Sequence, residues 1–381
     1  MKLIKEKTFD IKIIIALTII PILGIFGTLL YVINNGVVWQ EPLLLIVFWI
    51  ITGLSITIGY HRLFCHRSFT AHPILEWLLA FSGAAALENS ILKWCSDHRQ
   101  HHKHLDTDQD PYSITKGFFH AHIGWILKNN PSPIINVNDL QSKTAIRFQY
   151  KYYFPLFVVF GIALPIALGF LWGRPLGALF WGVFLRITLV HHFTYSINSL
   201  SHYIGKKPYN HKCTSRDSWY LAFLTFGEGF HNYHHKFQWD YRNGIRWFHY
   251  DPSKWTIWLF SKIGLAKELK KADQFWIIKT KALDTWNQVN DTLNSIPNQI
   301  RKSYQLKLND IIIKLNNLEE SHRISKNEVI SFCNDKKEMV LSQKLFRKKT
   351  KLYKIEYQAI MNTLSVMLFA IQTRQFYEII P

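Results

Sequence analysis

The hydrophobic pattern of the chain is dominated by four long apolar runs, which form two pairs. These runs occupy residues 11–33, 42–60, 153–172 and 176–198, and they are almost free of charged residues. At a rise of about 1.5 Å per residue, a helix of this length crosses a hydrocarbon layer about 30 Å thick. The pattern therefore predicts an all-α integral membrane protein with four transmembrane helices in two hairpins.

Shorter patterns fill the segments that follow each hairpin. The apolar stretch from Pro73 to Leu87 is too short to span a membrane and contains Glu76, which predicts a buried or interfacial helix. Polar and histidine-bearing segments come directly after the second and fourth runs, so each hairpin delivers them to the same membrane side. We expect residues 1–265 to form one membrane domain with a helical cap on that side.

The remaining segment, residues 266–381, has a different pattern. Its apolar residues recur with helical rather than alternating spacing, as in Leu306 to Leu318 and Lys344 to Ile371. We expect a basic helical C-terminal extension of unknown role. Solvated helices and a basic amphipathic helix lying on anionic lipid are both compatible with the pattern.

The charge of the chain indicates how the membrane domain is oriented. A net charge of +19 invites a nucleic-acid interpretation, but the basic residues flank and follow apolar runs, which is typical of membrane proteins. The loop from Asn34 to Glu41 has no basic residue, and the turn after the third run carries only Arg174. Because basic flanking segments are retained inside, we expect both termini and the cap to be cytoplasmic. The basic residues before the first run are Lys2, Lys5, Lys7 and Lys12.

Histidines gather in three short clusters close to the apolar runs. In a helix, positions i, i+3 and i+4 share a face, so the histidines of a His-x-x-His-His segment are expected to converge on one point. Asn198 and His202 form a matching i, i+4 pair at the end of the fourth run. The clusters are His61-Arg-Leu-Phe-Cys-His66, His98-Arg-Gln-His101-His102 and His231-Asn-Tyr-His234-His235.

The spacing of His61 and His66 is different. Five residues at about 100° each place the two rings roughly 140° apart on a straight α-helix, so either the helix ends between them or they serve two metals. Nine histidines and one amide also exceed the ligands that one first-row metal accepts, which predicts two ions. Imidazole suits Fe, Cu, Zn and Ni alike, whereas the lack of cysteine partners disfavours a structural zinc site.

Other polar residues near these segments allow a weaker interpretation. His120 and His122 are expected to make packing contacts or to support metal ligands, and His191 and His192 are functional candidates because they lie inside the fourth run. Glu228 precedes His231 by three residues and is expected to orient an imidazole rather than bind metal.

These motifs together resemble those of the membrane fatty acid desaturases of the stearoyl-CoA (delta-9) type. The resemblance covers roughly residues 10–265. It implies that the eight clustered histidines and His202 bind two irons (Fe2+) and that Asn198 reaches one of them through water. The motifs that carry it are Gly59-Tyr-His-Arg-Leu-Phe-Cys-His66, Asp97-His-Arg-Gln-His-His102, Asp110-Pro, His122-Ile-Gly-Trp125, Asn198-Ser with His202, and Gly227-Glu-Gly-Phe-His-Asn-Tyr-His-His235.

The same resemblance implies O2-dependent insertion of a cis double bond into a saturated fatty acyl-CoA chain of sixteen to eighteen carbons. Headgroup contacts are expected at Asn89, Trp94 and Arg99. Ser96, however, stands where animal acyl-CoA desaturases usually have arginine, so an acyl-lipid or carrier-protein substrate stays open. The chain contains no heme-binding His-Pro-Gly-Gly element, so electrons are expected from a separate cytochrome b5, ferredoxin or rubredoxin-like protein.

Alternatives remain in two classes. A histidine-box hydroxylase or ketolase would share the metal chemistry and return oxygen to the substrate. A membrane metal transporter would also concentrate histidines, but it needs a polar path through the spans, and Arg186, His191 and His192 provide little of one. The high Lys, Ile and Asn content favours a bacterial inner membrane as the location.

Overall fold

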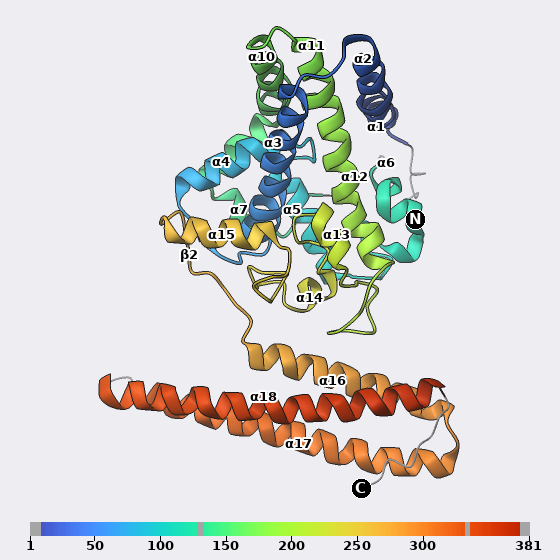
Figure 1. Cartoon of the computed structure of the whole chain (residues 1–381), viewed down its shortest axis with the longest axis vertical. Coiled ribbons are helices and arrows are strands. Elements are labelled where there is room, and N and C mark those ends of the chain that lie inside the picture. The colour runs from blue at the N-terminus through green and yellow to red at the C-terminus, as the bar shows by residue number, and fades with distance from the viewer. Residues whose placement is uncertain (1–8, 128–132, 332–335, 374–381) are drawn as a thin grey trace, which may run out of the picture. The chain divides into compact units, whose positions relative to one another are not determined.

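The computed structural model describes residues 9–127, 133–331 and 336–373, and the chain divides into two compact units. The first, the membrane unit, comprises Met1–Lys207 and Cys213–Lys271. The second, the C-terminal unit, comprises Pro208–Lys212 and Ala272–Pro381. Each unit is described by itself (Figure 1). The boundary expected at residues 265 and 266 stays a prediction.

Among the described residues of the membrane unit, four helices are long and apolar enough to cross a membrane, as the apolar runs predicted. Each contains a stretch of π-helix, in which a backbone N–H donates to the carbonyl five residues earlier instead of four. The four spans and their parts are Ile11–Asn35 with α1 (Ile11–Ile22), η1 (Leu23–Gly27) and α2 (Thr28–Asn35); Gln40–Cys65 with α3 (Gln40–Leu54) and η2 (Ser55–Cys65); Tyr153–Phe170 with α9 (Tyr153–Leu156), η5 (Phe157–Ala163) and α10 (Leu164–Phe170); and Pro175–His202 with α11 (Pro175–Ala178), η6 (Leu179–Leu185), α12 (Arg186–Ser199) and η7 (Leu200–His202).

Local sequence explains where the first hairpin begins and turns. Asp10 caps α1, because its side chain accepts hydrogen bonds from the backbone N–H groups of Lys12 and Ile13. The span ends at Gly36, whose positive φ of 66° suits a residue without a Cβ atom. Tyr31, Glu41 and Arg174 form a buried polar contact at this end, which ties the two hairpins together.

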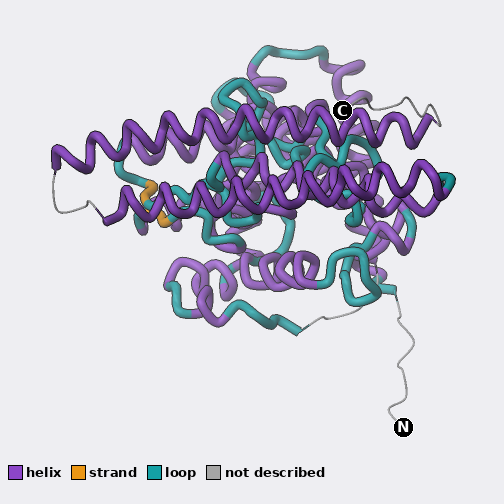
Figure 2. The backbone as a smooth tube through the Cα atoms, turned by 90° about the horizontal axis from the view of Figure 1, so that it is seen from below, coloured by secondary structure: helices purple, strands orange, loops and turns teal. Residues whose placement is uncertain are grey.

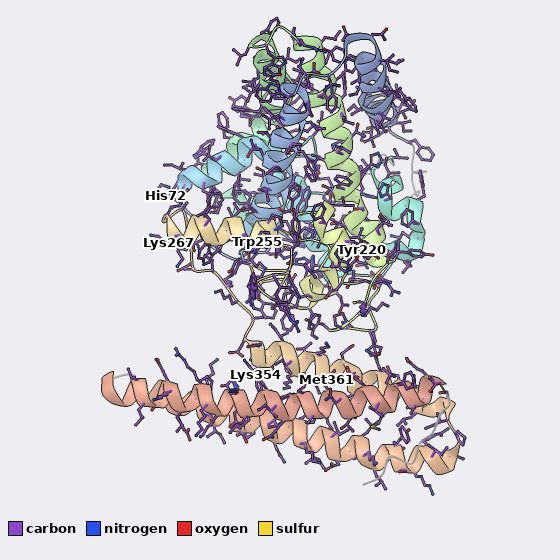
Figure 3. The ribbon with its side chains drawn as sticks, viewed as in Figure 1. His72, Tyr220, Trp255, Lys267, Lys354 and Met361 are labelled. Carbon is purple, nitrogen blue, oxygen red and sulfur yellow. The ribbon has the colours of Figure 1, made fainter. Side chains whose placement is uncertain are left out.

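Short helices and one small sheet build the cap. Helix α4 ends at Ala84, three residues before the end of the apolar stretch, because a tight turn follows. Figure 3 labels His72 and Lys267 at the sheet, where Thr70 pairs with Lys267 in antiparallel register. The cap elements are β1 (Thr70–Ala71), α4 (Pro73–Ala84), α5 (Ile91–Lys103), η3 (Ile114–Lys116), η4 (His120–Gly124), α6 (Trp125–Leu127), α7 (Asn138–Gln141), α8 (Thr144–Lys151), α13 (Trp219–Leu224), α14 (His231–Lys236), α15 (Pro252–Lys262) and β2 (Ala266–Lys267).

Three helices build the C-terminal unit, and Figure 2 shows the two longest, α17 and α18, as extended rods. Apolar side chains from all three form one buried core, which includes Val289, Leu315 and Leu364. The helical spacing of apolar residues is thus realised as a helical bundle. Its elements are α16 (Gln274–Thr292), η8 (Leu293–Ser295), α17 (Asn298–Ser331) and α18 (Lys336–Thr373).

Candidate metal centre and substrate cavity

The structure brings nine histidines together in two neighbouring groups. They come from η2 and the residue after it, from α5, from η7 and from α14. Within each group, one ring nitrogen of every member lies within 4.8 Å of those of the others. The five-histidine group consists of His61, His66, His98, His102 and His234, and the four-histidine group of His101, His202, His231 and His235.

The π-helix places His61 and His66 in the same group. The backbone N–H of His66 donates to the carbonyl of His61, 3.0 Å away, so five residues complete one turn. Their rings therefore lie on one face, with centroids 4.7 Å apart. Of the two explanations that the sequence left open, a helix end between the residues agrees with η2 ending at Cys65, whereas two separate metals are not needed, because the π-helical turn brings both rings into one group.

The other two clusters divide between the groups instead of each converging on one point. His98 and His102 join the five-histidine group while His101 joins the other, and His231 and His235 separate from His234 in the same way. Positions i and i+4 lie together, whereas i+3 lies about 100° away from i+4 on the same helix. Each of α5 and α14 therefore contributes to both groups, which sets the groups side by side.

Hydrogen bonds to the outer ring nitrogens fix how several imidazoles point. His101 Nδ1 donates to Asp110, 2.9 Å away, and His61 Nδ1 lies 3.0 Å from a carboxylate oxygen of Glu228. His202 Nδ1 lies 2.7 Å from the hydroxyl of Thr214. A carboxylate only accepts, so we assign the proton of His61 and His101 to Nδ1, which leaves a lone pair on Nε2.

These lone pairs face one another. The Nε2 atoms of His61 and His234 are 3.0 Å apart, and the same distance separates those of His231 and His202. Two lone pairs at this distance repel unless a cation lies between them, and about 3 Å is the spacing expected between adjacent nitrogen ligands with bonds of 2.0–2.1 Å. The donor set therefore fits two metal ions, one for each group.

Electrostatics favours the same state of the rings. Burial, followed by the influence of neighbouring imidazoles, holds the pKa of these histidines well below the usual value, so they are neutral at physiological pH and offer lone pairs. The affected residues outside the spans are His66, His98, His102, His231, His234 and His235.

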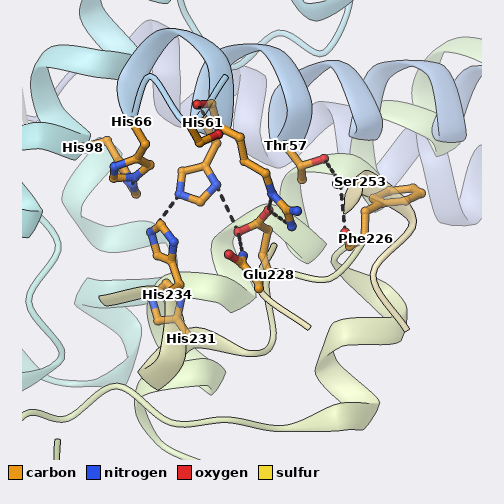
Figure 4. A network of polar contacts seen from close by, with 12 residues as sticks. Thr57, His61, His66, His98, Phe226, Glu228, His231, His234 and Ser253 are labelled. Atoms are coloured by element: carbon orange, nitrogen blue, oxygen red, sulfur yellow. Dashed lines mark hydrogen bonds and ion pairs between the residues drawn. The ribbon is translucent and has the colours of Figure 1, made fainter. Parts of the chain in front are cut away.

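Glu228 belongs to a buried ionic network behind His61, drawn in Figure 4. Both Glu228 and Asp251 bind Arg62, which is 1% exposed and also donates to the carbonyl of Tyr241. Burial raises the pKa of Glu228, but His61 and Arg62 outweigh it and bring the pKa to about 2. The carboxylate is thus held ionised against His61 Nδ1, an arrangement that orients metal-binding imidazoles.

A cavity of about 370 Å³ opens onto this centre. Its wall is mostly apolar, with residues of α1 such as Leu17 and Ile20 on one side, and it reaches His61, His98 and Glu228. Cavities of this size and lining hold small molecules or parts of them. The shape and polarity suit an apolar chain whose one segment lies against the histidines.

The structure places the other site residues proposed from sequence in different positions. Asn198, Asn89 and Trp94 line the cavity. Arg99 does not line it, because its guanidinium binds the carbonyls of Phe64 and Cys65 and the carboxylate of Asp139 instead. The geometry assigns Arg99 to holding the end of η2 in place.

Sequence reasoning gave no role to Glu88 or Thr194, which also line the cavity. The hydroxyl of Thr194 donates to Glu88 Oε1, 2.7 Å away, while Glu88 Oε2 is buried and has no hydrogen-bond partner among the described residues. Burial raises the pKa of Glu88 to about 8. The sequence signal for Glu88 as a cavity residue was a carboxyl group next to apolar residues. This signal is informative only once residues 84–90 are recognised as a turn.

The remaining histidines of the cap and of the fourth span lie outside both groups. His122 Nε2 lies 3.1 Å from His192 Nδ1, and His120 contacts the carbonyl of Pro111. His191 donates to the carbonyls of Ala86 and Leu87.

Four apolar spans, two all-histidine centres and an apolar cavity define an integral membrane protein of the histidine-box type. Residues 38–260 match the family model described as fatty acid desaturase, and the chain belongs to that family. It is 41% identical over 283 residues to a protein of Schizosaccharomyces pombe named probable acyl-CoA desaturase, a match covering 72% of this chain and 58% of the relative. It is 41% identical over 233 residues to acyl-CoA desaturase 1 of Saccharomyces cerevisiae, covering 60% of this chain and 46% of the relative.

A further relative is named for a lipid-bound acyl chain rather than for acyl-CoA. The chain is 39% identical over 234 residues to a protein of Anabaena variabilis named sn-1 stearoyl-lipid 9-desaturase, covering 60% of this chain and 84% of the relative. The chain spans about half the length of the two fungal relatives. The matched family model ends at residue 260, before the C-terminal unit begins its helices.

Proposed function

We propose that this protein is an O2-dependent fatty acyl desaturase that introduces a cis double bond, at the delta-9 position, into a saturated chain. The observation that carries the proposal is the direct opening of the apolar cavity onto His61 and His98 of the five-histidine group, which neighbours the four-histidine group. Unactivated C–H bonds offer no handle for acid, base or nucleophile, so their oxidation needs a redox metal and O2.

The reaction balances with two electrons from outside. Two C–H bonds of adjacent methylenes break, one C=C bond forms, and O2 with two electrons and two protons becomes two water molecules. Two irons held by the histidine groups would supply the oxidising chemistry, and a redox-inactive metal such as zinc would not. The protein's residues bind the chain in a water-poor cavity, and Glu228 and Asp110 hold His61 and His101 in the ligating tautomer.

The proposed ligands are the five histidines of one group and the four of the other, with Asn198 acting through water on the second. Asn198 lines the cavity and lies four residues before His202. This i, i+4 spacing to His202 supports a role of the Asn198 amide beside the four-histidine group.

Acyl-CoA is the proposed carrier, because the two fungal relatives carry that substrate in their names. Acyl-lipid is the second candidate, since the Anabaena relative is named for it. Ser96 favours neither carrier directly: its hydroxyl accepts from the backbone N–H of Ile135 and so lies in a local loop contact.

The remaining proposals concern the surroundings of the enzyme. The distribution of basic residues supports a cytoplasmic position for the cap and both termini. A bacterial inner membrane stays a prediction from composition, and the named relatives include fungal and cyanobacterial proteins. A cytochrome b5, ferredoxin or rubredoxin-like protein is the proposed electron donor.

Gas chromatography of total fatty acids from cells that express the chain with a competent donor tests the proposal. We expect a new cis-monoenoic acid that disappears in His101→Ala and persists in His104→Ala. His104 is a matched control because it follows the same helix but belongs to neither histidine group.

Metal analysis of the purified protein provides a second, independent test. Two irons per chain are expected. A hydroxylated fatty acid as the product would assign the protein to the hydroxylases instead. Exchangeable zinc flux into vesicles without any new fatty acid would refute the proposal that the protein is an enzyme.

A further inference from the structure

The turn between α4 and α5 forms part of the cavity wall and has a strained backbone. Leu87 and Asn89 both have positive φ values, 60° and 80°, although neither is glycine. Such conformations are unfavourable for residues with a Cβ atom and persist only when surrounding contacts hold them. Leu87, Glu88 and Asn89 all line the cavity.

Two buried side chains of α12 hold this turn by its carbonyl groups. Arg186 Nη1 donates to the carbonyl of Ala85 at 2.6 Å, and His191 Nε2 donates to those of Ala86 and Leu87 at 3.0 and 3.1 Å. Three successive carbonyls are thus fixed by one helix.

Arg186 has further bonds that connect the turn to the spans. Its Nε donates to the carbonyl of Gly182 and its Nη2 to that of Gly161, at 2.9 and 2.8 Å. Arg186 is 0% exposed, and its side chain does not belong to the wall of the cavity. It therefore acts on the substrate space only through the turn and the helices it binds.

The Ala85–Asn89 turn also positions the part of the cavity wall that lies next to the histidines. Thr194, also on α12, donates to Glu88, and Trp94 at the start of α5 lines the same cavity. The ring of Trp94 stacks on His98 with centroids 4.8 Å apart. A shift of the turn would therefore change the cavity at the point where a substrate chain passes the metal centre.

We propose that Arg186 and His191 are positioning residues that clamp the Ala85–Asn89 turn and thereby set which pair of methylenes meets the metal centre. The inference rests on the proposed desaturase function. Methylenes of an acyl chain are chemically alike and each adds the same small increment of binding, so the shape of the wall has to fix the register of the chain.

The test compares the double-bond positions in the products of paired variants of the full-length protein. Arg186→Met and His191→Phe remove the clamp, and Arg186→Lys and His191→Gln retain a donor. His192→Phe is the matched control, because His192 is the neighbouring ring on α12 and contacts His122 instead of the turn. Mass spectrometry of derivatised monoenes gives the isomer ratio, and hydrogen exchange reports the amides of residues 84–90 without any turnover.

We expect Arg186→Met and His191→Phe to raise the share of misplaced double bonds about fivefold, which corresponds to roughly 1 kcal/mol. Both variants should also accelerate hydrogen exchange of the backbone amides in the turn. The donor-retaining variants should give intermediate ratios, and His192→Phe the wild-type ratio. Wild-type isomer ratios in Arg186→Met and Arg186→Lys would overturn the clamp. If Arg186→Met does not accumulate, the Arg186→Lys ratio decides, because Arg186 lies outside the cavity wall whereas the ring of His191 also lines it. Absence of any monoene from the wild type would instead refute the proposed function.

Discussion

The membrane unit and the C-terminal unit both have an apolar core, but the membrane unit also buries an extended network of charged side chains. In the membrane unit, charged and polar side chains such as Arg62, Arg186 and Glu228 are buried, and each is satisfied by directed bonds. In the C-terminal unit, apolar side chains such as Leu315 and Leu364 form the core. Buried ionic groups are costly unless fully paired, so the network around Arg62 and Glu228 marks the unit whose side chains must be held in fixed directions, whereas the core of the bundle depends mainly on volume and pattern.

This difference also explains why the matched family model ends before the bundle. A directed network accepts few substitutions, because removing one partner leaves another buried group unpaired. An apolar helix core tolerates many sequences that preserve volume and spacing. Motifs are therefore recognisable around His61 and Glu228, and only periodicity is recognisable in α17 and α18.

The largest effect should follow from breaking one directed contact in the membrane unit. Asp110→Asn removes the carboxylate that accepts from His101 Nδ1, and such losses typically cost about 10- to 100-fold in metal affinity or activity. Monoene formation per mole of protein and bound iron measure the loss. Asp108→Asn, in the same loop but exposed, should retain both. Equal activity of the two variants would contradict the proposed role of the contact.

A core substitution in the bundle should destabilise that unit without affecting the reaction. Leu364→Ala, at a position that is 0% exposed, is expected to cost about 2–5 kcal/mol of unfolding free energy through lost burial and a residual cavity. Hydrogen exchange of α18 measures it. Val366 is on the same helix, but its side chain is 57% exposed. Val366→Ala should therefore change the free energy of unfolding by less than about 0.5 kcal/mol. Loss of monoene formation in Leu364→Ala would show that the bundle contributes to catalysis.

The spans and the composition of the centre were predictable, but the pairing of histidines was not. Apolar length is a local property, so the four spans follow directly from sequence. The group to which each histidine belongs depends on the π-helical turn at His61–His66 and on how α5 packs against α14. Neither is encoded in residue spacing alone. Arg99 illustrates the same limit, because only the fold reveals that its donors are used by the end of η2.

A smaller effect is expected from the titration of Glu88 in the cavity. Its pKa is raised by burial to about 8, so the neutral form is favoured in the fold; that stabilisation is complete below the ordinary pKa of about 4.5 and is lost as pH rises through about 8. Ionisation would place a charge beside the substrate chain. We expect KM for the acyl substrate to rise severalfold between pH 7 and 9, and Glu88→Gln to flatten this rise.

Steady-state kinetics across this pH range measure the effect. Glu76→Gln, a carboxylate on α4 that pairs with Lys143, should keep the wild-type pH dependence and serves as the control. A KM profile that is the same in Glu88→Gln and the wild type would assign the dependence to another group.

The smallest effect should come from ion pairs of the C-terminal unit, and it sharpens the contrast between directed and patterned burial. His211 lies between two carboxylates: Asp284, which accepts from both the backbone N–H and Nδ1, and the more exposed Asp291, 3.2 Å from Nε2. Hydrogen bonds from His211 and Lys212 lower the pKa of Asp291, so its contribution is present above the ordinary pKa of about 3.8 and is lost only as pH falls below it. Exposed pairs contribute little because water and salt screen them. Asp291→Asn should therefore leave hydrogen exchange of α16 unchanged between pH 6 and 8, whereas Asp284→Asn should accelerate it by removing a buried acceptor of two bonds. The opposite order would mean that this unit, too, depends on a directed network.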